Sequence, residues 1–126
     1  MLAAADIVTV LQKENVIAFN MPSKIQVLLS SQRPIVASVP AEGTAAKAIN
    51  SSGGGVVVPP ENPQALAEAI LTLYHSPGQM AQLAQSGRRY AEKTYRFEVA
   101  LERYENLLTE AIAKPHRVTQ RRLALR

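Results

Sequence analysis

The sequence contains no cysteine and no tryptophan, and only 5% of its 126 residues are aromatic. Without cysteine the chain cannot form a disulfide framework, a thiolate zinc site, an iron–sulfur cluster or a thiol nucleophile. The scarcity of aromatic side chains argues against a stacking surface for single-stranded nucleic acid. The two histidines, His75 and His116, stand alone, so we expect no metal site.

Long apolar runs are also missing. No run approaches the roughly 18 residues that a membrane-spanning helix needs. Residues 1–6 lack the positive flank of a secretory signal. We therefore expect a soluble, cytoplasmic protein whose contact with a membrane is at most peripheral. The hydrophobic fraction of 47% is enough for a core, and the length suits one domain.

Acidic residues are absent after residue 113, and this absence sets the net charge of +4. The chain has 14 basic and 10 acidic residues, and five of the basic ones lie in residues 114–126. The first 113 residues therefore carry 9 basic and 10 acidic side chains, a net charge of −1. We predict a basic, disordered tail at 114–126 and no specific nucleic-acid partner. Weak binding of the tail to an anionic surface is the alternative.

Short β-branched strands alternate with helices over the first 60 residues. The strand patterns cover residues 6–11, 34–39 and 56–58, with helical patterns at 22–31 and 44–50 between them. This alternation predicts an α/β fold with parallel strands and right-handed crossovers. Three strands are few for such a sheet, so we interpret them as part of a doubly wound, Rossmann-like sheet.

The pattern after residue 60 is wholly helical. Asn62 followed by proline predicts a helix start, and residues 76–79 have the form of a capping box. Ser86-Gly87 suggests a break in the helix that follows. The last helix is expected at residues 96–113, where apolar residues recur at helical spacing.

The turn before the first helix is the best candidate binding site. A helix N-terminus offers free N–H donors and a partial positive charge, which suit a phosphate, and a hydroxyl and a lysine add to them. The alternative is that these are ordinary first-turn residues on a solvated surface. The candidate residues are Asn20, Met21, Ser23 and Lys24.

Two other segments could contact a ligand. Glu42 and Gly43 follow a strand end, where open α/β sheets bind ligands, although such a pair more often opens a helix. The glycines at 53–55 lack both the phosphate-loop and the dinucleotide motif, so they predict a helix C-cap and a turn.

Several blocks in a fixed order carry a resemblance to one family. The chain resembles the end of a retaining glycosyltransferase of the two-Rossmann-domain (GT-B) class, family 4, in the subgroup with a Pro-Ser-Lys turn. The blocks cover about two thirds of the chain and are residues 21–24, 31–38, 55–70, 87–90 and 97–98.

The resemblance implies a nucleotide-sugar donor as substrate and no cofactor or metal, in polysaccharide or cell-envelope glycan synthesis. Residues 1–60 would be the second half of the donor-binding domain, 61–113 the helices packed on it, and 114–126 the tail. A missing N-terminal domain or a partner chain would bind the acceptor. The turn at residues 20–24 would bind the donor diphosphate.

The family usually carries two glutamates near the donor. On the resemblance, Val27 stands at the position of the second, which grips the ribose, and Glu14 is the nearest carboxylate for the first. The possible further donor contacts are Glu14 from this comparison, and Glu42 and Gly43 because they follow a strand end.

Two other interpretations remain open. The chain could be a non-catalytic interaction module, or an anionic-surface binder that acts through its tail. We expect the isolated chain to lack transferase activity. Nothing in residues 7–11 protects a strand edge. We therefore expect the chain to pair edge to edge with a second copy through residues 6–11, to pack a helix or its tail over them, or to aggregate.

Overall fold

A computed structural model describes residues 4–15 and 24–113. It contains a parallel sheet with the order β1-β2-β3, formed by β1 (Val8–Leu11), β2 (Ile35–Ser38) and β3 (Gly55–Val58). Val8 is in register with Ile35, and Ile35 with Gly55. The predicted α/β fold with parallel pairing is confirmed.

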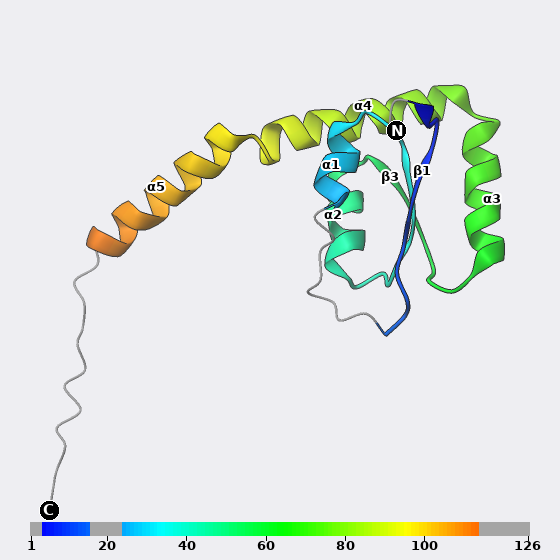
Figure 1. Cartoon of the computed structure of the whole chain (residues 1–126), viewed down its shortest axis with the longest axis horizontal. Coiled ribbons are helices and arrows are strands. Elements are labelled where there is room, and N and C mark those ends of the chain that lie inside the picture. The colour runs from blue at the N-terminus through cyan, green and yellow to red at the C-terminus, as the bar shows by residue number, and fades with distance from the viewer. Residues whose placement is uncertain (1–3, 16–23, 114–126) are drawn as a thin grey trace, which may run out of the picture. The chain divides into compact units, whose positions relative to one another are not determined.

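Four helices surround the sheet. Helices α1 (Lys24–Ser30) and α2 (Thr44–Ser52) lie on one side of it, and α3 (Pro63–Tyr74) lies on the other (Figure 1). Helix α4 (Pro77–Thr94) runs across the end at which the strands begin. The loops at the opposite end of the sheet are not covered by a described helix.

The core lies around β2, whose four residues are all buried. Apolar residues of α1 and α2 pack against one face of this strand, and Leu73 of α3 is buried as well. The largest fully buried side chains are Ile25, Leu29, Ile35, Val36, Val39, Ile49 and Leu73.

The glycines between α2 and β3 form the predicted cap and turn. Gly53 has a left-handed backbone with φ 58°, and its N–H donates to the carbonyl of Asn50 at 3.2 Å. This conformation ends α2 without the steric cost that a side chain would bring. The prediction of a helix C-cap here is confirmed.

Helix α4 begins at Pro77, as the pattern at residues 76–79 predicts, but two details of this helix differ from the prediction. Ser76 precedes the helix but makes no side-chain cap hydrogen bond, so there is no capping box. The helix also continues through Ser86 and Gly87 without a break. Gly87 is buried, and the space a side chain would need there is taken by Gly54 and Leu29. Close packing accounts for this glycine.

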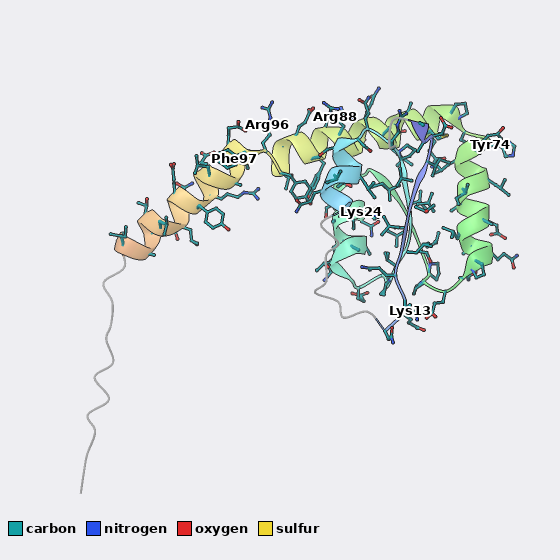
Figure 2. The ribbon with its side chains drawn as sticks, viewed as in Figure 1. Lys13, Lys24, Tyr74, Arg88, Arg96 and Phe97 are labelled. Carbon is teal, nitrogen blue, oxygen red and sulfur yellow. The ribbon has the colours of Figure 1, made fainter. Side chains whose placement is uncertain are left out.

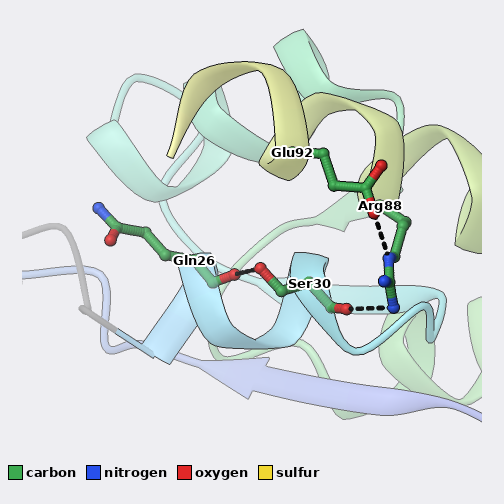
Figure 3. Close-up of polar contacts among 4 residues, drawn as sticks. All are labelled: Gln26, Ser30, Arg88 and Glu92. Atoms are coloured by element: carbon green, nitrogen blue, oxygen red, sulfur yellow. Dashed lines mark hydrogen bonds and ion pairs between the residues drawn. The ribbon is translucent and has the colours of Figure 1, made fainter. Parts of the chain in front are cut away.

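A polar contact joins α4 to α1 (Figure 3). Arg88 donates from Nε to Glu92 Oε1 at 2.8 Å, and from Nη1 to the carbonyl of Ser30 at 3.4 Å. Helix α1 has no basic residue in its own last turn, so an arginine from α4 reaches its final carbonyl. The Arg88 side chain is about half-exposed, yet it links two helices.

Helix α5 (Phe97–Ala113) forms a unit separate from residues 1–96. Its position matches the predicted last helix. None of its residues is buried, and its apolar stripe includes Phe97, Leu101, Tyr104, Leu108 and Ile112. The predicted tail at 114–126 lies outside the described residues.

Candidate functional site

The strands end at the edge of the sheet opposite α4. Loops leave this edge at residues 12–15 after β1, 39–43 after β2 and 59–62 after β3. Figure 2 shows Lys13 at this end of the sheet and Arg88 of α4 at the other. Ligands of open α/β sheets bind outside the carboxyl ends of the strands. This edge is therefore the candidate site.

Two hydrogen bonds hold these loops together. The backbone N–H of Glu14 donates to Oε2 of Glu61 at 3.2 Å. The buried Ser38 hydroxyl donates to the carbonyl of Pro59 at 3.0 Å. The loops after β1 and β3 are thus tied to each other, and β2 is tied to the loop after β3.

A hollow of about 360 Å³ lies between the end of β1 and the start of α3. A second hollow of about 460 Å³ lies beside it and shares Lys13 and Glu61. Apolar walls with a few polar groups suit a ligand that has both a ring and hydroxyl or charged groups. The first hollow is lined by Leu11, Gln12, Lys13, Ser38, Glu61, Asn62, Pro63 and Leu66, and the second by Lys13, Glu14, Asn15 and Glu61.

Glu61 has an unusual backbone conformation. Its φ of 55° is left-handed, which costs a residue with a side chain about 1 kcal/mol or more. The next residue, Asn62, caps α3 with its Oδ1, which accepts the N–H of Ala65 at 3.0 Å. The predicted N-cap is confirmed, and the strained residue lies directly beside it. Backbone strain of this kind is concentrated at functional sites.

The structure describes four of the seven predicted site residues. Glu14 lines the second hollow, and Lys24 is the exposed first residue of α1. Glu42 is exposed, and Gly43 is the buried N-cap residue of α2. Neither of these two residues lines a hollow at this edge. The remaining predicted residues, Asn20, Met21 and Ser23, lie outside the described residues.

The sequence analysis missed Lys13 and Glu61, which line both hollows. Lys13 lies two residues after β1 and Glu61 three residues after β3, and this placement at the carboxyl end of a strand is the signal that could have found them. Val27, at the position of the family's ribose-binding glutamate, is an exposed residue of α1. No described carboxylate takes its place on α1.

Other chemistry is sparse in the part of the chain that the structure describes. Arg88 and Glu92 form an ion pair at 2.8 Å. Residues 4–15 and 24–113 hold no group of three or more side chains that could bind a metal ion. None of the helices described is long and apolar enough to cross a membrane.

Two solved structures resemble this one. Sucrose-phosphate synthase from Thermosynechococcus elongatus has a TM-score of 0.71 and 21% sequence identity, over 90% of this chain and 27% of that one. HepE from Anabaena, solved in complex with UDP and glucose, has a TM-score of 0.65 and 22% identity, over 87% of this chain and 28% of that one. The chain has a GT-B-type fold. It spans little more than a quarter of these two proteins.

Sequence comparisons do not identify a family for the chain. No protein-family model matches the chain, and no curated protein matches it significantly. At identities of 21% and 22%, the likeness establishes the fold alone.

Proposed function

We propose that the chain forms half of the donor-binding domain of a glycosyltransferase that uses a nucleotide sugar. The observation that carries the proposal is the pair of hollows at the carboxyl ends of the strands, in a fold shared with two glycosyltransferases. Membership of family 4, the Pro-Ser-Lys subgroup, a cytoplasmic location and a role in polysaccharide or cell-envelope glycan synthesis are parts of the same proposal.

The donor would be held by groups with different tasks. The apolar wall formed by Leu11 and Leu66 suits a flat ring, and the carboxylate of Glu61 suits ribose or sugar hydroxyls. Lys24 is the first residue of α1, the helix that follows β1 in the chain, and its ammonium would neutralise a diphosphate. Asn20, Met21 and Ser23 complete this proposed diphosphate site.

Transfer of the sugar needs the leaving diphosphate to be stabilised and the acceptor to be positioned. In the proposal, lysines such as Lys24 stabilise the leaving diphosphate. A further domain or a partner chain binds and positions the acceptor. The reaction would transfer a glycosyl group to a hydroxyl with retention at the anomeric carbon.

Titration with UDP, followed by amide NMR shifts, tests the proposal. We expect weak binding, about millimolar, because half of the site is present. The shifts should centre on residues 12–15, 24 and 61–62. Lys24→Ala should weaken binding several-fold, whereas Lys93→Ala on α4 should leave it unchanged. Shifts centred on α4, or equal effects of the two variants, would reject the assignment.

A further inference from the structure

Glu61 keeps a full side chain at a position where a glycine would cost less. Its φ of 55° is close to the 58° of Gly53, which ends α2. At Gly53 the chain uses the residue that has no Cβ atom, whereas Glu61 bears the steric cost of the same left-handed backbone. A contact of the Glu61 side chain that offsets this cost would explain why a glutamate stands here.

The backbone on both sides of Glu61 is anchored. Before it, the carbonyl of Pro59 accepts a hydrogen bond from the buried Ser38 hydroxyl at 3.0 Å. After it, Asn62 caps α3, and its Oδ1 accepts the N–H of Ala65 at 3.0 Å. The carboxylate of Glu61 is therefore carried by a segment that is held to the sheet on one side and to a helix on the other.

The loop after β1 is attached at two points around Lys13. The N–H of Gln12 donates to the Ser38 carbonyl at 2.9 Å, at the end of the ladder with β2. Two residues further along, the N–H of Glu14 donates to Oε2 of Glu61 at 3.2 Å. Lys13 lies between these two hydrogen bonds, at the loop end of the sheet (Figure 2), and lines both hollows. Its backbone is thus held by the sheet on one side and by Glu61 on the other.

We propose that Glu61 is a positioning residue, which holds Lys13 at the two hollows through the Glu14 N–H. Residues 13–15 are exposed, so without this hydrogen bond the loop could move away from the hollows. With the bond, the Lys13 ammonium stays beside the space in which a phosphate group of a nucleotide would lie. The role in ligand binding rests on the proposed function, whereas the hold on the loop does not.

A carboxylate suits this task better than a neutral acceptor. Hydrogen bonds to an ionised oxygen are roughly twice as strong as neutral ones. Glu61 and Lys13 also line the same two hollows, so their opposite charges attract the ammonium toward the site. The carboxylate can accept several hydrogen bonds, so the bond to the Glu14 N–H still leaves an acceptor for a ligand hydroxyl.

Amide hydrogen exchange in the chain without ligand tests the hold on the loop. Glu61→Ala removes the acceptor of the Glu14 N–H, whereas Glu61→Gln keeps a side-chain oxygen of the same reach. Both variants lose the charge and keep the left-handed backbone, so the acceptor distinguishes them. We expect the Glu14 amide to exchange about fivefold faster in Glu61→Ala than in Glu61→Gln. Equal rates would overturn the proposal.

A double-mutant cycle with UDP as the probe tests whether Glu61 acts through Lys13. We expect Lys13→Ala and Glu61→Ala each to weaken UDP binding about fivefold, and the double variant to be weakened about fivefold as well, because both changes remove the same contribution. Glu61→Gln should bind UDP at least as tightly as the wild type. Independent effects, about 25-fold in the double variant, would overturn the proposal.

Two further results separate this proposal from the proposed function. Glu68→Ala removes an exposed carboxylate of α3 that lines neither hollow, and it should leave UDP binding unchanged. If UDP does not bind to the wild-type chain, the proposed function is rejected, and the exchange rates measured without ligand still decide whether Glu61 holds the loop. If UDP binds equally well to the wild type and to Glu61→Ala, the positioning role alone is rejected.

Discussion

Gly54 and Gly87 lie with their backbones in direct contact. A Cβ atom placed on Gly54 would come within 2.8 Å of the Gly87 Cα, and one placed on Gly87 within 3.1 Å of the Gly54 Cα. The residue just before β3 and the middle of α4 therefore meet with no side chain between them. Leu29 of α1 fills the remaining space, so three elements converge on this point.

Gly54→Ala should destabilise the fold strongly. The new methyl would overlap both Gly87 and the Leu29 side chain, and such overpacking typically lowers the free energy of unfolding by about 2 kcal/mol. Urea denaturation measures the change. Gly78→Ala is the matched control, because nothing lies within 4 Å of the added Cβ and alanine favours a helix. Equal midpoints for the two variants would contradict the packing argument.

Glu61 gives a second prediction, based on its φ of 55°. Glu61→Ala removes the carboxylate that accepts the Glu14 N–H, but the alanine still bears the energetic cost of the left-handed backbone. Glu61→Gly removes the carboxylate and also that energetic cost. We expect the glycine variant to be more stable than the alanine variant by about 1 kcal/mol in urea denaturation. Identical stabilities would show that the left-handed backbone carries no cost here.

The helix caps supply a matched pair of substitutions. Asn62→Ala removes the side-chain acceptor of the Ala65 N–H and should lower the free energy of unfolding by about 1 kcal/mol. Ser76→Ala, at the same position of α4, should be close to neutral because Ser76 makes no cap hydrogen bond. Thermal melts of both variants would show the difference. A loss at Ser76 as large as that at Asn62 would contradict it.

Tyr95 makes stability depend on pH in alkaline solution. Burial raises the pKa of Tyr95 above its ordinary value, and the neighbouring Tyr90, whose ring centroid lies 5.9 Å away, raises it further. A raised pKa in the folded state stabilises the protein below the unfolded pKa, near 10, and this contribution is lost as pH rises through the folded pKa.

Urea midpoints measured between about pH 9 and about pH 11 should therefore fall for the wild-type chain. Tyr95→Phe, which cannot ionise at this position, should flatten part of that fall. A Tyr95→Phe profile parallel to that of the wild type would show that ionisation of Tyr95 is not responsible.

The 126-residue chain alone should not transfer a sugar. It spans about a quarter of the two similar proteins, and the proposed function places acceptor binding in a further domain or a partner chain. A coupled assay for nucleotide release, with UDP-sugars and mixed hydroxyl acceptors, should stay at background. Release that depends on both donor and acceptor would refute this expectation.

Local patterns were enough to predict most of the fold. The strands, their parallel pairing, the Asn62 cap and the Gly53 turn each depend on a few adjacent residues whose chemistry is decisive. Gly87 was wrongly taken as a helix break. A glycine is needed there because its backbone packs against Gly54, a residue 33 positions away that only folding brings near.

The candidate site was less predictable for the same reason. The contact between the Glu14 N–H and the Glu61 carboxylate spans 47 positions, and no spacing rule links such residues. Lys13 is a lone charge beside a strand, which in sequence is indistinguishable from any solvated lysine. Lys24, by contrast, was singled out by its helix start, and its role remains a prediction.

The placement of α4 across one end of the sheet makes the two ends unequal in their tolerance of sequence change. Substitutions at the amino end must preserve a backbone contact in which not even a methyl group fits. Residues 12–15 and 59–62 at the other end are largely exposed and anchored by a few hydrogen bonds, so they can be replaced without disturbing the core. Selection or engineering for a new ligand would therefore act on residues 12–15 and 59–62 and leave the amino end unchanged.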